Sequence, residues 1–202
     1  MLGSAPTKIG ALILEALLVS TGVVALAEIG DKTQLLALLL AARFRKPLPI
    51  IAGIFVATLL NHAFAAAVGT WITTVLPPGV LRWALGLSFI AMAIWTLVPD
   101  KVDDAAPEQA PRWGVFGTTV VAFFLLEMGD KTQIATVMLA AKYAALTSVV
   151  IGTTLGMMLA NVPAVLLGEV AARKLPMRLV HSIAAAIFLV IGVLVLLGRA
   201  GV

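Results

Sequence analysis

The sequence predicts an all-α integral membrane protein with six transmembrane helices, arranged as two inverted three-helix repeats. The first observation behind this class is composition: the 202 residues are 61% hydrophobic and 12% charged, and their mean hydropathy is +1.10. The second is a set of six apolar runs, and the third is an alignment between the two halves. Because a bilayer core of ~30 Å needs about 20 apolar residues per helix, the chain can supply roughly six spans and no soluble domain.

The spans are expected where apolar runs lie between segments that carry Pro, Gly or charge. The first run contains no small-residue cleavage site in a suitable place, so we expect a spanning helix rather than a removed signal peptide. The polar segment 99–112 is the longest break, and it divides the chain into a first repeat, 1–98, and a second repeat, 113–202. The expected spans are about 9–42, 48–72, 80–98, 114–141, 146–170 and 178–198.

The two halves of the chain resemble each other at a fixed offset of 99 residues. This offset aligns all three apolar runs of each half without a gap. Because each unit has an odd number of spans, the second copy must enter the membrane upside down relative to the first. The identical pairs are Glu28/Glu127, Gly30/Gly129, Asp31/Asp130, Lys32/Lys131, Thr33/Thr132, Gln34/Gln133, Ala41/Ala140, Ala42/Ala141, Gly53/Gly152, Gly69/Gly168 and Phe89/Phe188.

Basic residues at the ends of the spans predict how the chain is oriented. Cytoplasmic loops gather Lys and Arg, and the expected topology places eight of these residues on one side and four on the other. We therefore expect the 99–112 linker in the cytoplasm and both termini outside it. The larger set is Arg43, Arg45, Lys46, Lys101, Arg112, Arg173, Lys174 and Arg178, and the smaller set is Lys8, Arg82, Lys142 and Arg199.

Each repeat carries a Glu-x-Gly-Asp-Lys-Thr-Gln segment inside its first apolar run. In a continuous helix, residues three apart share a face, so Glu28 and Asp31 are expected to converge, as are Glu127 and Asp130. An ionisable group near the bilayer centre costs at least ~2.5–3.5 kcal/mol on insertion scales. Four acids and two lysines at this depth therefore indicate a function.

A purely structural alternative pairs Glu28 with Lys32, and Glu127 with Lys131, as salt bridges between residues four apart. Buried ion pairs are weak sources of stability, and small or neutral polar residues would join helices at lower cost. The glycine of each segment favours a local kink or a close helix approach, and for the glycines alone simple helix packing stays open. We favour the functional interpretation of the acids.

The charges and donor atoms of the two segments match a hard divalent cation. Four carboxylates and two ammonium groups leave a net charge of minus two, which one divalent ion would neutralise. Oxygen ligands suit calcium, manganese or magnesium better than copper or zinc, and the chain has no cysteine. Buried carboxylates can also take up protons when the metal leaves. The expected ligands are Glu28, Asp31, Thr33, Gln34, Glu127, Asp130, Thr132 and Gln133, with Lys32 and Lys131 setting the charge.

Three further polar residues lie in the second spans, two in the first repeat and one in the second. Asn61 and Asn161 could line the same ion path, and simple hydrogen bonding between helices is an equal alternative for each. His62 is left out of the expected metal site, because a lone histidine is more often a satisfied polar contact and no second histidine is expected at its depth. Gly152-x-x-x-Gly156 is a small-residue pattern typical of helix packing.

The duplicated Glu-x-Gly-Asp-Lys-Thr, at Glu28–Thr33 and Glu127–Thr132, resembles the signature of the Gdt family of secondary transporters. The similarity covers essentially the whole chain. It implies exchange of manganese or calcium for protons, with bacterial members exporting manganese, and it implies cation ligation by the four acids. The chain lacks the long N-terminal extension and the long central loop of eukaryotic relatives, which favours a prokaryotic cell membrane over an organelle.

We therefore expect a multi-pass alternating-access antiporter of the cell (inner) membrane. Its substrates would be Mn²⁺ or Ca²⁺ and protons, with no cofactor, and it would export the metal from the cytoplasm. The lipid bilayer is its expected surroundings. No nucleic acid partner is expected, because the fourteen Lys and Arg are scattered. The sequence leaves homo-oligomerisation and the choice between the two metals open.

Three other functions compete with this expectation. A passive divalent-cation channel could use the acids as a selectivity ring. An exporter of small organic solutes such as amino acids could use the lysines to bind a carboxylate. An intramembrane enzyme is disfavoured, because the sequence shows no Ser/His pair, no His-rich metal site and no phosphate-binding loop.

Overall fold

The structure, a computed structural model, describes residues 5–98, 113–167 and 177–199. The expected linker at 99–112 and the basic pair Arg173 and Lys174 lie outside the described residues. The described segments contain helices and no strand. These helices are α1 (Ala5–Glu28), α2 (Lys32–Phe44), α3 (Pro47–Val75), α4 (Pro78–Thr96), α5 (Gly114–Glu127), α6 (Lys131–Tyr143), α7 (Leu146–Leu167) and α9 (Met177–Leu196).

Five of the described helices are long and apolar enough to cross a bilayer. They are Ile9–Glu28, Pro47–Val75, Pro78–Thr96, Leu146–Leu167 and Met177–Leu196, and the apolar helix Gly114–Glu127 is shorter. Large apolar side chains such as Leu48, Phe64 and Leu159 are exposed, as lipid contact requires. The chain is therefore an all-α membrane protein, as predicted.

Two expected spans differ from the prediction, because each is divided into two helices. The 9–42 run forms α1 and α2, and the 114–141 run forms α5 and α6. Both divisions fall inside the Glu-x-Gly-Asp segments. Hydropathy does not detect them, because the apolar residues before and after each short polar segment continue one run.

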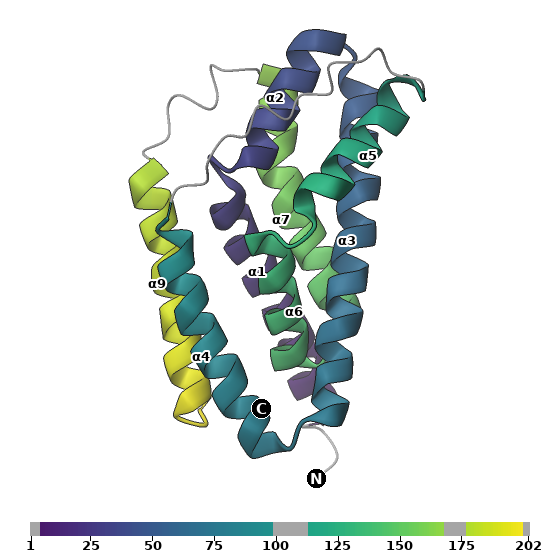
Figure 1. The fold of residues 1–202 in the computed structure, drawn as a ribbon. Coiled ribbons are helices and arrows are strands. Elements are labelled where there is room, and N and C mark those ends of the chain that lie inside the picture. Colours follow the sequence, from purple (N-terminus) through teal and green to yellow (C-terminus); the bar gives the residue numbers. More distant parts are fainter. Residues whose placement is uncertain (1–4, 99–112, 168–176, 200–202) are drawn as a thin grey trace.

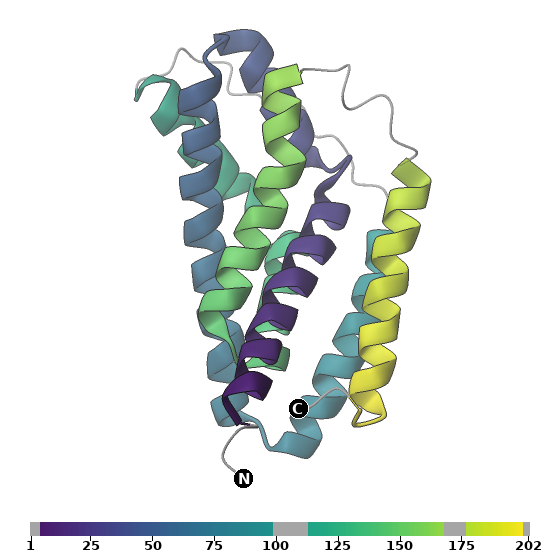
Figure 2. The same cartoon turned by 180° about the vertical axis from the view of Figure 1, so that it is seen from behind.

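The helices form one bundle in which the segments 99 residues apart run in opposite directions (Figure 1). In that view α1 and α2 ascend, whereas α5 and α6 descend. The start of α1 and the end of α9 lie at the same end of the bundle. Helices α3, α5, α6 and α7 pack together, α1 lies along α7 (Figure 2), and α4 pairs with α9 at one side.

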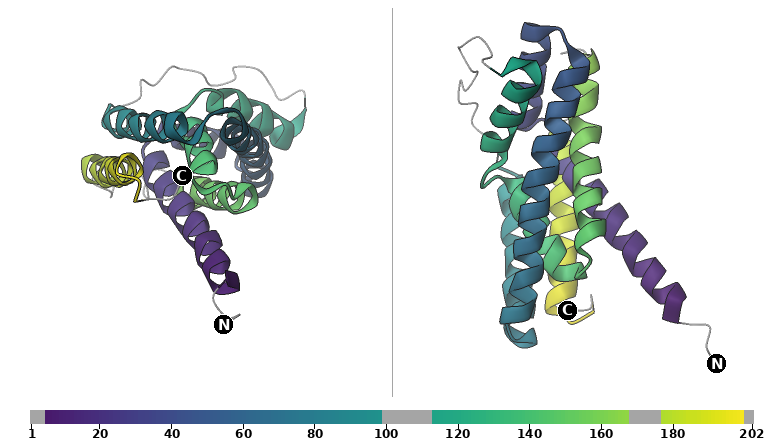
Figure 3. Two further views of the ribbon diagram at one scale, coloured as in Figure 1. Left: turned by 90° about the horizontal axis from the view of Figure 1, so that it is seen from below. Right: turned by 90° about the vertical axis from the view of Figure 1, so that its right-hand side faces the viewer.

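Small residues allow the closest helix contacts. A Cβ atom on Gly152 would lie 2.6 Å from the carbonyl oxygen of Leu17, and one on Gly156 would lie 2.6 Å from that of Thr21. The Gly152-x-x-x-Gly156 pattern therefore packs α7 against α1, which confirms its predicted packing role. The first half of α1 leans away from the bundle (Figure 3).

The equivalent contact in the other half joins α3 to α5 and α6. A Cβ atom on Gly53 would lie 2.7 Å from Cβ of Thr119, and Gly69 lies directly against the carbonyl oxygen of Val137. The α4–α9 pair has its own contact, in which the rings of Phe89 and Phe188 stack with centroids 6.3 Å apart. These contacts hold the two helix breaks inside the bundle.

Candidate cation site

The two Glu-x-Gly-Asp segments form nearly identical breaks in the helices. Helix α1 ends at Glu28 and α2 begins at Lys32, with Gly30 at φ +85° and Asp31 as an extended N-cap at φ −79° and ψ 169°. The second segment repeats this geometry, with Gly129 at φ +76°. Only glycine adopts such a positive φ without strain, so each glycine permits a full break.

The prediction that each acid pair shares one helical face is therefore wrong. Each Glu is the last residue of one helix and each Asp is the N-cap of the next, so the i,i+3 spacing no longer sets their relation. Each glycine was expected to favour a kink or a close helix approach, whereas the structure shows a full interruption of the helix. The same interruption removes the i,i+4 geometry that a Glu28–Lys32 or Glu127–Lys131 salt bridge would need.

The two glutamines of the segments hold the breaks in shape. Oε1 of Gln34 accepts a hydrogen bond of 2.9 Å from the Gly30 amide, and Oε1 of Gln133 accepts one of 2.7 Å from the Gly129 amide. The Gln34 amide group also donates to the carbonyl oxygen of Ala160 at 3.0 Å. These predicted ligands thus already have backbone partners in this conformation.

Three carboxylates from the two breaks converge at one point. Glu28, Asp31 and Asp130 each offer an oxygen atom, and these atoms all lie within 4.8 Å of one another. Their side chains are 0%, 3% and 3% exposed, respectively. Like charges this close inside a protein repel strongly unless a cation or protons neutralise them. The fold thus brings carboxylates from segments 99 residues apart together as a candidate cation site.

Glu127 has a different setting from Glu28, although both are fully buried. Oε2 of Glu127 accepts a hydrogen bond of 3.1 Å from the Thr132 hydroxyl. Oε1 of Glu28 instead receives the side-chain amide of Asn161 at 3.5 Å. The Thr33 hydroxyl has no hydrogen-bond partner within the described segments.

The two motif lysines also differ. Nζ of Lys32 lies 3.2 Å from Oδ1 of Asp130, so it joins the first segment to the second. Nζ of Lys131 donates to the carbonyl oxygen of Val98 at 2.9 Å and lies 6.0 Å from the centroid of the Trp95 ring. Lys32 thus places a positive charge against the carboxylate group.

The predicted pathway residues are separated by the fold. Asn161 contacts Glu28 and also donates to the carbonyl oxygen of Met157 at 3.1 Å. Asn61 donates to the carbonyl oxygen of Phe124 at 3.1 Å and so joins α3 to α5. Asn161 lies at the carboxylate site, whereas Asn61 stabilises helix packing beside it.

Sequence reasoning missed the cover that α9 provides over the first break. A ring nitrogen of His181 lies 2.8 Å from the carbonyl oxygen of Ile29. A Cβ atom on Gly30 would lie 2.8 Å from the sulfur of Met177. No sequence signal pointed to this contact, because it depends on how α9 packs against the end of α1.

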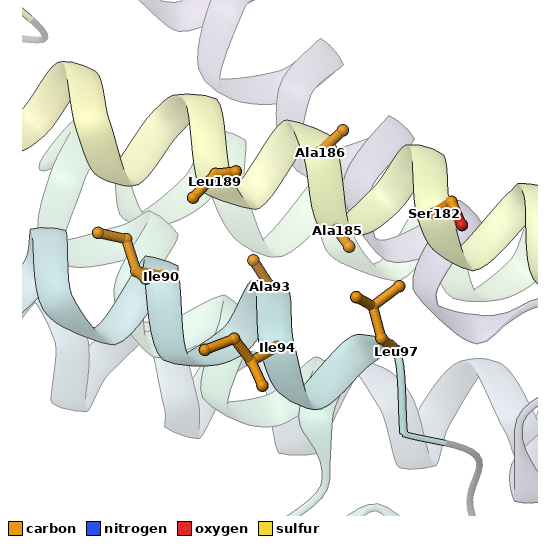
Figure 4. A pocket seen from close by; sticks show the side chains of 8 residues that line it. All are labelled: Ile90, Ala93, Ile94, Leu97, Ser182, Ala185, Ala186 and Leu189. Atoms are coloured by element: carbon orange, nitrogen blue, oxygen red, sulfur yellow. The ribbon is translucent and has the colours of Figure 1, made fainter.

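A cavity of about 370 Å³ lies elsewhere, between α4 and α9 (Figure 4). Its walls are apolar apart from Ser182, and include Ile90, Ile94 and Leu189. The Ser182 hydroxyl donates to the carbonyl oxygen of Arg178 at 2.7 Å. This cavity offers no ligand set for a cation, so the carboxylate group is the candidate site.

Comparison with known proteins shows the family of the chain. The family model described as "Divalent cation/proton antiporter GDT1" matches residues 16–104 and 115–201, so it covers both halves of the chain. The chain belongs to the GDT1 family. This is a family of transporters rather than of enzymes, and its substrates are divalent cations and protons.

Other GDT1-type proteins match most of the chain. A Vibrio cholerae protein named "Putative manganese exporter" is 54% identical over 178 residues, which cover 88% of each chain. "GDT1-like protein 3" of Oryza sativa subsp. indica is 28% identical over 93% of this chain and 75% of its own. "GDT1-like protein sll0615" of Synechocystis is 29% identical over 82% and 88%, respectively. No solved structure matches the chain.

Proposed function

We propose that this protein exchanges a divalent cation, with Mn²⁺ as the main substrate, for protons and exports the metal from the cytoplasm. The observation that carries the proposal is the convergence of Glu28, Asp31 and Asp130 within 4.8 Å inside the bundle. A group of buried carboxylates is stable when it holds either one divalent ion or protons. Mutually exclusive occupancy of this kind is what couples the two fluxes.

The donor atoms of the site are compatible with manganese, and the name of one relative favours it. The donor atoms of the site are carboxylate oxygens, which suit Mn²⁺ and Ca²⁺ and do not suit softer ions. The relative that is 54% identical bears the name of a manganese exporter. Ca²⁺ would be a competing substrate, since the same oxygens accept it.

The architecture proposed for transport is six spans in two inverted repeats, 1–98 and 113–202. The 99-residue offset and the opposite directions of α1–α2 and α5–α6 support it (Figure 1). In such transporters, broken helices meet near the midplane, and one repeat moves against the other to expose the site alternately. Here the broken helices are the ones that carry the acids.

The proposed orientation follows from the distribution of basic residues. Both termini would lie outside the cytoplasm of a cell (inner) membrane, with the 99–112 linker inside. An inward proton gradient would then drive metal outward through exchange at the same carboxylates. The start of α1 and the end of α9 lie at the same end of the bundle, which supports placing both termini on one side of the membrane.

The ligand set comprises the acids Glu28, Asp31 and Asp130, with Glu127 joining as the repeats move. Thr33 and Thr132 would add hydroxyl oxygens. Gln34 and Gln133 would act mainly by holding the breaks, and Asn161 by orienting Glu28. Lys32 would occupy the site as an internal cation and leave Asp130 when the metal arrives.

The test is metal-driven proton flux in proteoliposomes of the purified protein, with a pH-sensitive dye in the lumen. Addition of Mn²⁺ outside should release protons from the lumen of liposomes that contain the protein, and should not do so in liposomes without it. Glu28→Gln and Asp130→Asn should abolish the signal. Glu15→Gln is the matched control, because the Glu15 side chain is 54% exposed and should not affect transport.

Two results would contradict the proposal. Transport by Glu28→Gln and Asp130→Asn at the rate of the parent would refute the site. Mn²⁺ entry that is unaffected by collapse of the pH gradient and moves no protons would indicate a channel.

A further inference from the structure

The side chain of His62 on α3 is fully buried, and it has no role in the site described above. Neither of its ring nitrogens has a hydrogen-bond partner among the residues that the structure describes. Buried polar groups are nearly always satisfied, so an imidazole with both nitrogens unengaged needs an explanation. A ligand that binds in another state of the protein is one such explanation.

The packing of α3 places His62 beside the second helix break. Gly69 lies against the carbonyl oxygen of Val137 on α6, and the two helices run in the same direction. His62 is two turns, or ~10.5 Å, before Gly69 on the same face of α3. The residue two turns before Val137 is Asp130, at the start of α6.

A contact between α3 and α5 gives a second estimate of the height of His62 in the bundle. Asn61, its neighbour, donates to the carbonyl oxygen of Phe124, which is three residues before Glu127. His62 is therefore level with the segment from Glu127 to Asp130. Oε1 of Glu127 likewise has no hydrogen-bond partner within the described part of the chain.

The internal repeat indicates the partner of His62. The 99-residue offset aligns His62 with Asn161, and the Asn161 side chain contacts Glu28. If the other half repeats this arrangement, the side chain of His62 is directed toward Glu127. The two halves thus differ in chemistry at equivalent places, because one has an amide and the other has an imidazole.

We propose that His62 is a nitrogen ligand for the transported ion on the Glu127 side of the site, and that it selects Mn²⁺ over Ca²⁺. Ca²⁺ takes oxygen ligands, whereas first-row transition-metal ions also bind imidazole nitrogen. The carboxylates alone distinguish the two ions poorly. This inference deepens the proposed function and rests on it, because the ligand named serves the transported ion.

The first test is electron spin echo spectroscopy of Mn²⁺ bound to the purified full-length protein labelled with ¹⁵N-histidine. The Mn²⁺ signal should show coupling to a histidine nitrogen. The coupling should disappear in His62→Asn and remain in His181→Asn, the matched control at the other histidine of the chain. Absence of histidine coupling in the parent protein would overturn the proposal. This outcome does not depend on whether any variant folds.

The second test is competition between the metals in the flux assay. His62→Asn and His62→Gln supply oxygen in place of nitrogen, and each should lower the preference for Mn²⁺ over Ca²⁺ about tenfold, the scale on which residues around a metal tune its affinity. An unchanged preference would overturn the proposal. Histidine coupling without metal-driven proton flux would refute the antiport function and leave His62 as a ligand; flux without coupling would do the reverse.

Discussion

The two motif segments share six residue types in the same order, yet the fold gives their side chains different partners. In the first segment Glu28 joins a three-carboxylate group and Lys32 reaches Asp130 of the other segment. In the second, Glu127 accepts a hydrogen bond from Thr132, and Nζ of Lys131 donates to the carbonyl oxygen of Val98. Equal sequences in the two halves therefore do not make identical contacts in one conformation, as the proposed alternation between two states would require.

The largest expected difference concerns the acids of the second segment. Asp130→Asn should lower Mn²⁺-driven proton flux by about a hundredfold or more, because it removes a member of the carboxylate group and the ion pair with Lys32. Glu127→Gln should lower it only about tenfold, because Glu127 lies outside the group of three and already has a hydroxyl donor. Flux measured in matched proteoliposomes checks this. Equal losses would show that the two acids are equivalent.

The lysines should show a smaller difference. Lys32→Gln removes the positive charge that lies 3.2 Å from Asp130, so the concentration of Mn²⁺ at half-maximal flux should fall about tenfold, or about 1.4 kcal/mol in binding. Lys131→Gln removes a hydrogen bond to the neutral carbonyl oxygen of Val98, and the loss of such a bond should change this concentration less than about threefold. A titration of flux against Mn²⁺ measures both. A larger effect at Lys131 would reverse the proposed roles of the two lysines.

Substitutions at the two glycines of the breaks should show the smallest difference. It should appear in thermal stability rather than in affinity for the metal. Alanine at a positive φ costs roughly 1–2 kcal/mol, so both Gly30→Ala and Gly129→Ala should lower the thermal midpoint in detergent. Gly30→Ala should lower it further, because its Cβ would lie 2.8 Å from the sulfur of Met177, whereas nothing lies within 4 Å at Gly129. Equal midpoints would indicate that Met177 moves aside without cost. An unchanged midpoint in both variants would contradict the strained geometry.

The location of the site could be predicted from the sequence, but its geometry could not. The acids, lysines and glycines were identified because they interrupt apolar runs and recur at a fixed offset. The convergence of Glu28 and Asp31 was predicted correctly, but the reason given was wrong, since i,i+3 spacing assumes a continuous helix. A glycine in an apolar run is compatible with a kink, a close packing contact or a full break, and local propensity does not separate these outcomes.

The sequence by itself determined the membrane class, the position of the apolar runs and the duplicated segments, because hydropathy and repetition are local properties that need no knowledge of packing. Only the tertiary structure decided that Asp130 joins Glu28 and Asp31, that Lys32 reaches Asp130 of the other segment and that His62 lies level with the second break. These relations connect residues far apart in the chain. They depend on the register between packed helices, which close contacts such as Gly69 against Val137 set, and no local pattern encodes that register.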